Sequence, residues 1–166
     1  MKQLFIIAVI FTLFVSCGPS KDDAVKYNDA IVEQEMLIIN KEDSLIEAIS
    51  RNQSDKAERL YKDFVSQINS STEKINKTDA FDHEKAFREA ALELFKSYKS
   101  AAENEYADMM KITRIPDEVY TKEDDDKLID LSKTVFDKLN IELGKFSKAQ
   151  KNFADKYKLE LTNKSK

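Results

Sequence analysis

Glycine and proline are scarce in this chain of 166 residues, which contains only two of each. One of each stands near the N-terminus, at Gly18 and Pro19. Folds rich in β-strands need many tight turns, and such turns draw on Gly, Pro and Asn-Gly pairs. The chain has no Asn-Gly or Asp-Gly pair. Long helices with few connections are the economical alternative, so the sequence predicts an all-α fold.

Apolar residues recur three or four positions apart along four long segments, which is the spacing of amphipathic helices. Pro116 stands in the longest connection between them and cannot continue a helix comfortably. Four helices with three short connections predict an up-down-up-down four-helix bundle. A three-helix solenoid fragment and an extended coiled-coil oligomer are the alternatives. The predicted helices are about 22–50, 57–75, 87–112 and 121–161, forming one bundle domain (22–161) with a frayed tail (162–166).

Short polar side chains stand where these helices should begin. Such side chains accept hydrogen bonds from the free backbone amides of a first helical turn. Two pairs approximate capping boxes, and three single residues are candidate caps for the second and third helices. The pairs are Ser20 with Asp23 and Thr121 with Asp124, and the single residues are Ser54, Asp79 and Asp82.

Two residues are unusual for their predicted places. Gly144 lies inside the fourth helix, where glycine costs about 1 kcal/mol relative to alanine, and this predicts close packing against a neighbouring helix. Tyr120 lies in the longest connection, is expected to be exposed, and is a candidate contact residue. If the first helix points away from the N-terminal segment, the connections 51–55 and 113–120 share the far end of the bundle.

The first residues of the chain have the pattern of a secretory signal peptide. Lys2 precedes an apolar run of twelve residues, 4–15, and the small residue Ser16 follows. A helix of that length spans about 18 Å, whereas a bilayer core needs roughly 30 Å. A buried core helix is the alternative. The pattern predicts a signal peptide over residues 1–16, not a permanent membrane helix.

Cys17 is the only cysteine, so it has no partner for an internal disulfide. The run Phe14-Val15-Ser16-Cys17 resembles the lipobox of bacterial lipoproteins, although leucine is usual where Phe14 stands. The resemblance implies cleavage between Ser16 and Cys17 and acylation of Cys17 with a diacylglycerol and a further chain such as palmitate. Several chains on one residue suffice for stable attachment to a membrane. A secreted protein with a spare cysteine is the alternative.

The lipidated tether, residues 17–21, leads into an acidic stretch. Ser20-Lys21-Asp22-Asp23 resembles the export signal of surface lipoproteins in Bacteroidota, and this implies display on the outer face of the outer membrane. The alternatives are attachment facing the periplasm and a simple role as polar spacer and helix cap. Further along, Asp43-Ser44-Leu45 resembles a short O-glycosylation sequon of exported Bacteroidota proteins, which makes Ser44 a possible glycosylation site.

Signatures of catalysis are absent from the sequence. The chain has no Gly-x-Ser-x-Gly turn, no phosphate-binding loop and no Glu-x-x-His motif for a di-iron site. Its single histidine, His83, is expected to be an exposed surface residue. The net charge of −4 comes from 27 basic and 31 acidic residues that are intermixed, which argues against nucleic-acid binding. The sequence predicts no enzymatic activity, no metal site and no cofactor.

Three blocks of the chain resemble an uncharacterised family of helical surface proteins found in spirochaetes and Bacteroidota. The blocks are YNDAIVEQ at 27–34, FREAALELFKSY at 87–98 and FADKYKLEL at 153–161. They are helix patterns without catalytic residues. The resemblance implies a helical bundle at the cell surface or outer membrane, and it implies no activity.

These observations predict a monomeric outer-membrane lipoprotein without enzymatic activity. Its partners would be the membrane, through the lipid on Cys17, and an envelope or host macromolecule that contacts its helical surface. The alternative function is a helical-bundle carrier of an apolar small molecule or haem, which requires a cavity between the helices.

Overall fold

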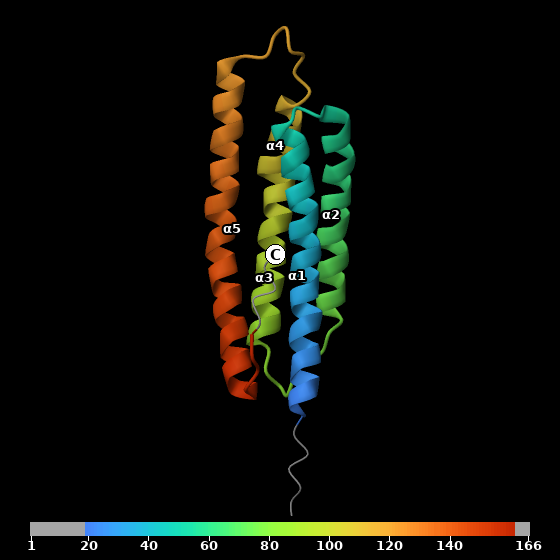
Figure 1. Cartoon of the computed structure of the whole chain (residues 1–166), viewed down its shortest axis with the longest axis vertical. Coiled ribbons are helices and arrows are strands. Elements are labelled where there is room, and N and C mark those ends of the chain that lie inside the picture. The colour runs from blue at the N-terminus through green and yellow to red at the C-terminus, as the bar shows by residue number, and fades with distance from the viewer. Residues whose placement is uncertain (1–18, 162–166) are drawn as a thin grey trace, which may run out of the picture.

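The computed structural model describes residues 19–161, which form an all-α four-helix bundle (Figure 1). The predicted fold class is therefore confirmed. The third helix of the bundle consists of three consecutive segments, and the other helices are single segments. The bounds are α1 Lys21–Ser50, α2 Ser54–Asn76, α3 Ala86–Ala101, the π-helical turn η1 Ala102–Tyr106, α4 Ala107–Ile112 and α5 Lys122–Tyr157. The predicted signal peptide 1–16, its cleavage site Ser16–Cys17, the lipidation site and the tail 162–166 lie outside the described residues.

Both predicted capping boxes are present. At the start of α1, the backbone amide of Asp23 donates to Ser20 Oγ over 3.1 Å, and the Ser20 amide donates to Asp23 Oδ2 over 3.3 Å. Thr121 and Asp124 form the same reciprocal arrangement at α5, where the Thr121 amide donates to Asp124 Oδ2 over 3.0 Å. Each box satisfies amides that the first helical turn leaves free. The four residues of the predicted export signal thus form the cap and first turn of α1.

The single-residue caps are wrong. Ser54 lies inside the first turn of α2, and its hydroxyl donates instead to the carbonyl of Thr113. The segment before α3 forms a separate turn in which Asp82 and His83 adopt positive φ angles of 50° and 62°. This turn displaces the start of α3, so Lys85, not Asp79 or Asp82, is its N-cap. His83 is exposed, as predicted.

The last helix ends earlier than the predicted Leu161. Lys158 has the left-handed angles φ 55° and ψ 43°, and its backbone amide donates back to Asp155. A left-handed residue after the last turn is a common way to satisfy terminal carbonyls of a helix. α5 therefore ends at Tyr157.

The turns at 51–53 and 113–121 share one end of the bundle, opposite the start of α1 (Figure 1). Asn52 Nδ2 donates to Asp117 Oδ1 over 3.3 Å across these two connections. The predicted up-down arrangement of the connections is therefore present, and the end that carries them is called the loop end below. The other end contains Ser20 and is called the cap end.

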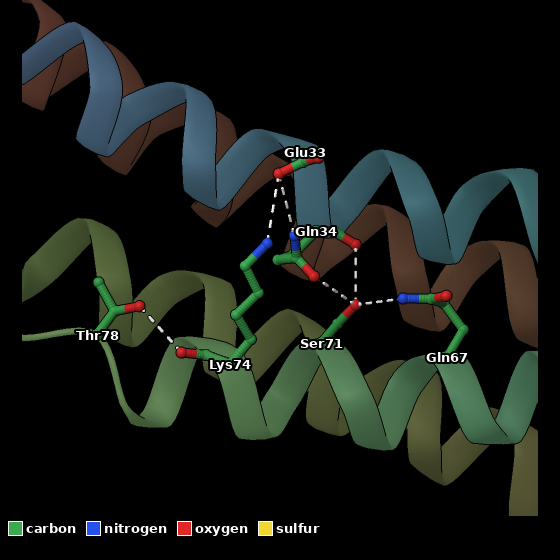
Figure 2. Close-up of polar contacts among 6 residues, drawn as sticks. All are labelled: Glu33, Gln34, Gln67, Ser71, Lys74 and Thr78. Atoms are coloured by element: carbon green, nitrogen blue, oxygen red, sulfur yellow. Dashed lines mark hydrogen bonds and ion pairs between the residues drawn. The ribbon is translucent and has the colours of Figure 1, made fainter.

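A polar cluster lies in the contact between α1 and α2 (Figure 2). Ser71 is fully buried and lies 3.3 Å from the Oε1 atom of Gln34, to which its hydroxyl donates, and Gln67 donates to Ser71 over 3.0 Å. At the surface, Lys74 Nζ forms an ion pair with Glu33 Oε2 over 3.4 Å. Buried polar groups carry a cost unless they are hydrogen-bonded, so these pairs favour one register of α2 against α1.

Aromatic rings cluster at the cap end and join α5 to the other helices. Phe153 of α5 is buried, with its ring centroid 5.4 Å from that of Tyr27 in α1 and 5.5 Å from that of Phe87 in α3. The ring centroid of Phe81, in the turn before α3, lies 5.0 Å from that of Tyr157. Offset and edge-on ring pairs at these distances are favourable beyond the area they bury. α5 is therefore firmly packed at its C-terminal half.

Gly144 lies on the exposed side of α5, and a Cβ atom added there meets no other atom within 4 Å. The predicted close packing against a neighbouring helix is therefore wrong. Without that role, glycine only raises the entropic cost of forming the helix. We expect Gly144→Ala to raise the free energy of unfolding by about 0.5–1 kcal/mol, as measured by urea denaturation. A decrease would contradict the open environment of this residue.

Candidate ligand cleft between α1 and α5

The N-terminal third of α5 packs loosely against the bundle. All buried residues of α5 lie at Val135 or beyond it, so more than three helical turns of this helix contribute no fully buried side chain. A cleft of about 940 Å³ opens here towards the loop end, between α5, the C-terminal half of α1 and the third helix. Ligand sites for small molecules occupy clefts of about 300–1,000 Å³.

The walls of the cleft are apolar and exposed. Ile129 and Phe136 of α5 retain 64% and 65% of their surface, and Ile46 of α1 faces them from the opposite wall. Exposed apolar side chains that gather in one concave surface indicate a binding site more strongly than the same residues scattered singly. Other apolar lining residues are Ile49, Met109, Leu128, Val135, Leu139 and Leu143.

A buried carboxyl group forms the polar part of the cleft. Glu42 of α1 is only 8% exposed, and its Oε1 atom accepts a hydrogen bond of 2.7 Å from the Tyr106 hydroxyl. Burial raises the pKa of Glu42 to about 7, against the opposing effect of this hydrogen bond. Burial and the nearby Glu42 raise the pKa of Tyr98 and of Tyr106, so both phenols remain hydrogen-bond donors.

A π-helical turn places the two tyrosines on the same side of the third helix. Residues eight apart on a regular α-helix differ by about 80° in direction, whereas the residue inserted by a π turn reduces this to about 20°. Tyr98 precedes η1 and Tyr106 ends it. The Tyr61 hydroxyl donates to the Ala102 carbonyl over 3.0 Å within this turn, and Lys138 of α5 pairs with Glu105 at 2.7 Å.

The mouth of the cleft lies at the start of α5. Tyr120, Lys122, Asp125 and Asp126 line it, and the Tyr120 hydroxyl donates to Asp125 Oδ1 over 2.8 Å. Tyr120 is half-buried, so the predicted full exposure is wrong, and its contact role stays a prediction. Its place at the mouth is compatible with the predicted contact role.

Of the candidate site residues singled out from the sequence, only Tyr120 lines this cleft. Ser20–Asp23 cap and begin α1 at the cap end, and the turn that carries His83 lies at the same end, where its Phe81 contacts Tyr27 of α1. Ser44 lies in an unbroken stretch of α1, where its hydroxyl donates to the Asn40 carbonyl over 2.9 Å. The predicted sequon 43–45 therefore lies in a helix and not in a loop, and the Ser44 hydroxyl already donates a hydrogen bond within that helix.

Glu42 was missed because it stands in the polar run 40–44, which interrupts the apolar pattern of the first helix. The spacing of Glu42 from its apolar neighbours nevertheless indicates that it is buried. Glu42 follows the buried Ile38 by four residues and precedes the buried Leu45 by three, so it occupies a core position of the repeat. A carboxylate at a core position is rarely buried without a partner or a function.

Within residues 19–161, no helix combines the length and hydropathy needed to cross a bilayer, and no three potential metal ligands gather in one place. No protein-family model, curated protein or solved structure matches this chain.

Proposed function

We propose that this protein is a non-enzymatic lipoprotein of the outer membrane that binds an apolar small molecule in the cleft between α1 and α5. The proposal of membrane attachment rests on the apolar run and lipobox-like residues before Cys17. The proposal of binding rests on one observation, the cleft of about 940 Å³ with exposed apolar walls. In this proposal the protein faces the cell exterior, because Ser20–Asp23 resemble a surface-export signal.

The cleft favours a small molecule over a macromolecule bound to the outer helical surface. Ile129, Phe136 and Ile46 converge on one concave site instead of forming a flat patch. A haem ligand has less support. No histidine lines the cleft, because His83, the only histidine of the chain, stands in the turn before α3.

We expect Cys17→Ala to release the protein from the membrane. The variant lacks the thiol that would be acylated, and attachment through several acyl chains is lost with it. When cells that express the full chain are fractionated, the wild type should be found in the outer-membrane fraction and the Cys17→Ala variant in the soluble envelope fraction.

Protease treatment of intact cells tests whether the wild-type protein is displayed on the cell surface. Retention of the variant in the membrane would contradict lipid anchoring, and survival of the wild type beside cleaved surface proteins would contradict display.

Binding in the cleft is tested with the apolar dye N-phenyl-1-naphthylamine, whose fluorescence rises in apolar surroundings. The soluble form 18–166 contains every described helix and buried residue. We expect Ile129→Ala to weaken dye binding about fivefold, because each buried methylene contributes about 0.8 kcal/mol and part of that contact is lost.

Ile141→Ala is the matched control. Ile141 is also an isoleucine of α5 with 61% of its surface exposed, but it does not line the cleft. Dye affinity should therefore stay within about twofold of the wild type. Equal weakening by both substitutions, or no dye binding at all, would contradict the proposed site.

A further inference from the structure

Glu42 is a buried acid without a cationic partner. Among the described residues, no lysine or arginine pairs with it, and its contacts are the phenols of the third helix. Buried carboxylates are normally paired with a cation or held neutral. The Glu42 side chain lines the cleft, so a cation could reach it from a bound molecule.

The other charged groups of the cleft reinforce this preference. Asp125 and Asp126 line the mouth, and Lys122 is the one basic residue among the lining side chains. Three acids against one lysine give the cleft an excess of negative charge. A ligand with a positive group is complementary to this field, and a ligand with a carboxylate is opposed by it.

The phenols also orient Glu42. Tyr106 donates to one of its oxygens over 2.7 Å, and a carboxylate has lone pairs to accept further donors. A protonated amine has N–H donors and a positive charge, and it matches this acceptor. An alcohol supplies one donor without charge, and a carboxylate at high pH supplies none.

We propose that the ligand of the cleft is an apolar molecule with one protonated amine, whose ammonium group pairs with Glu42 while its apolar part lies along Ile129 and Phe136. This inference rests on the proposed function and adds the chemical class of the ligand. Lys122 lies at the mouth and not beside Glu42, so the alternative of a fatty acid would place its carboxylate at the mouth.

Three ligands with the same twelve-carbon chain test the proposal: dodecylamine, dodecanol and dodecanoate. Each is titrated into the soluble form 18–166 by calorimetry at a pH above 7, with dodecylamine and dodecanoate below their critical micelle concentrations and dodecanol below its aqueous solubility. Dodecylamine should bind at least about tenfold more tightly than the other two, and Glu42→Gln should remove this advantage, since loss of one partner of a buried charge pair is costly. The glutamine side chain of this variant keeps an oxygen that can accept from Tyr106, and dodecanol affinity should change less than about threefold.

Glu35→Gln is the matched control. Glu35 lies two turns earlier on α1, its side chain is partly buried, and it does not line the cleft. This variant should keep the preference for dodecylamine. Equal binding of all three ligands, tightest binding of dodecanoate, or an unchanged preference in Glu42→Gln would overturn the amine assignment and leave apolar binding standing. Absence of binding by all three would overturn the proposed function together with it.

Discussion

Replacing Phe153 with alanine is expected to lower the free energy of unfolding by about 3–5 kcal/mol. The ring is 1% exposed, and its centroid lies 5.4 Å from that of Tyr27, 5.5 Å from those of Phe81 and Phe87, and 4.7 Å from that of Tyr157. Truncation would leave a cavity where α1, the turn before α3, α3 and α5 meet. Urea denaturation followed by far-UV circular dichroism measures the effect.

Phe136→Ala provides the control on the same helix. Phe136 retains 65% of its surface, so the same truncation should change the free energy of unfolding by no more than about 0.5 kcal/mol. A loss of less than about 1 kcal/mol in Phe153→Ala would show that the aromatic cluster repacks around the gap, and the cluster would then not be the contact that holds α5.

Substitution of Glu42 by glutamine is expected to stabilise the protein above pH 7 and to have little effect below pH 4.5. The pKa of Glu42 rises from 4.5 to about 7 through burial, so the folded state binds more protons than the unfolded state between these values. The stability of the wild type therefore falls as pH rises through this window. A shift of this size corresponds to at most about 3 kcal/mol, fully developed above the folded pKa.

The measurement is the difference in unfolding free energy between Glu42→Gln and the wild type across this pH range. The difference should be close to zero at the acidic limit and largest above pH 7. Glu33→Gln is the control, because the Glu33 side chain is 62% exposed, although it pairs with Lys74 and accepts a hydrogen bond of 3.4 Å from Gln34. Its effect should stay below about 1 kcal/mol. A difference for Glu42→Gln that is constant with pH would exclude a titrating carboxyl as its cause.

The fold was predictable because its signals are local. The two capping boxes lie within four residues of sequence, and the apolar spacing of each helix reports its buried face. The capping predictions for Ser54 and Asp82 were wrong for two reasons, a partner far along the chain for Ser54 and a local backbone turn for Asp82. Ser54 finds the Thr113 carbonyl, and Asp82 is taken up by a left-handed turn.

The cleft could not be predicted in the same way, because it depends on how far α5 lies from α1. The apolar stripe of α5 continues through Leu128 and Leu131, and the periodicity of these residues resembles that of the buried Val135 and Leu139. One signal was available in the third helix, where buried residues recur four apart three times from Leu94 to Tyr106. Repeated spacing of four exceeds the 3.6-residue period, and the π turn absorbs this excess.

The capping box at Ser20 marks where α1 begins, and this sets the distance along the helix from the N-terminal segment to the cleft. Glu42 lies about 33 Å along α1 from Ser20, at a rise of 1.5 Å per residue, and this is close to the hydrocarbon thickness of a bilayer. A bundle that stands upright on a lipid at Cys17 would hold its cleft well clear of the headgroups. Under the proposed function and attachment, the ligand would then reach the cleft by diffusion through water or by transfer from another protein, and not directly from the membrane.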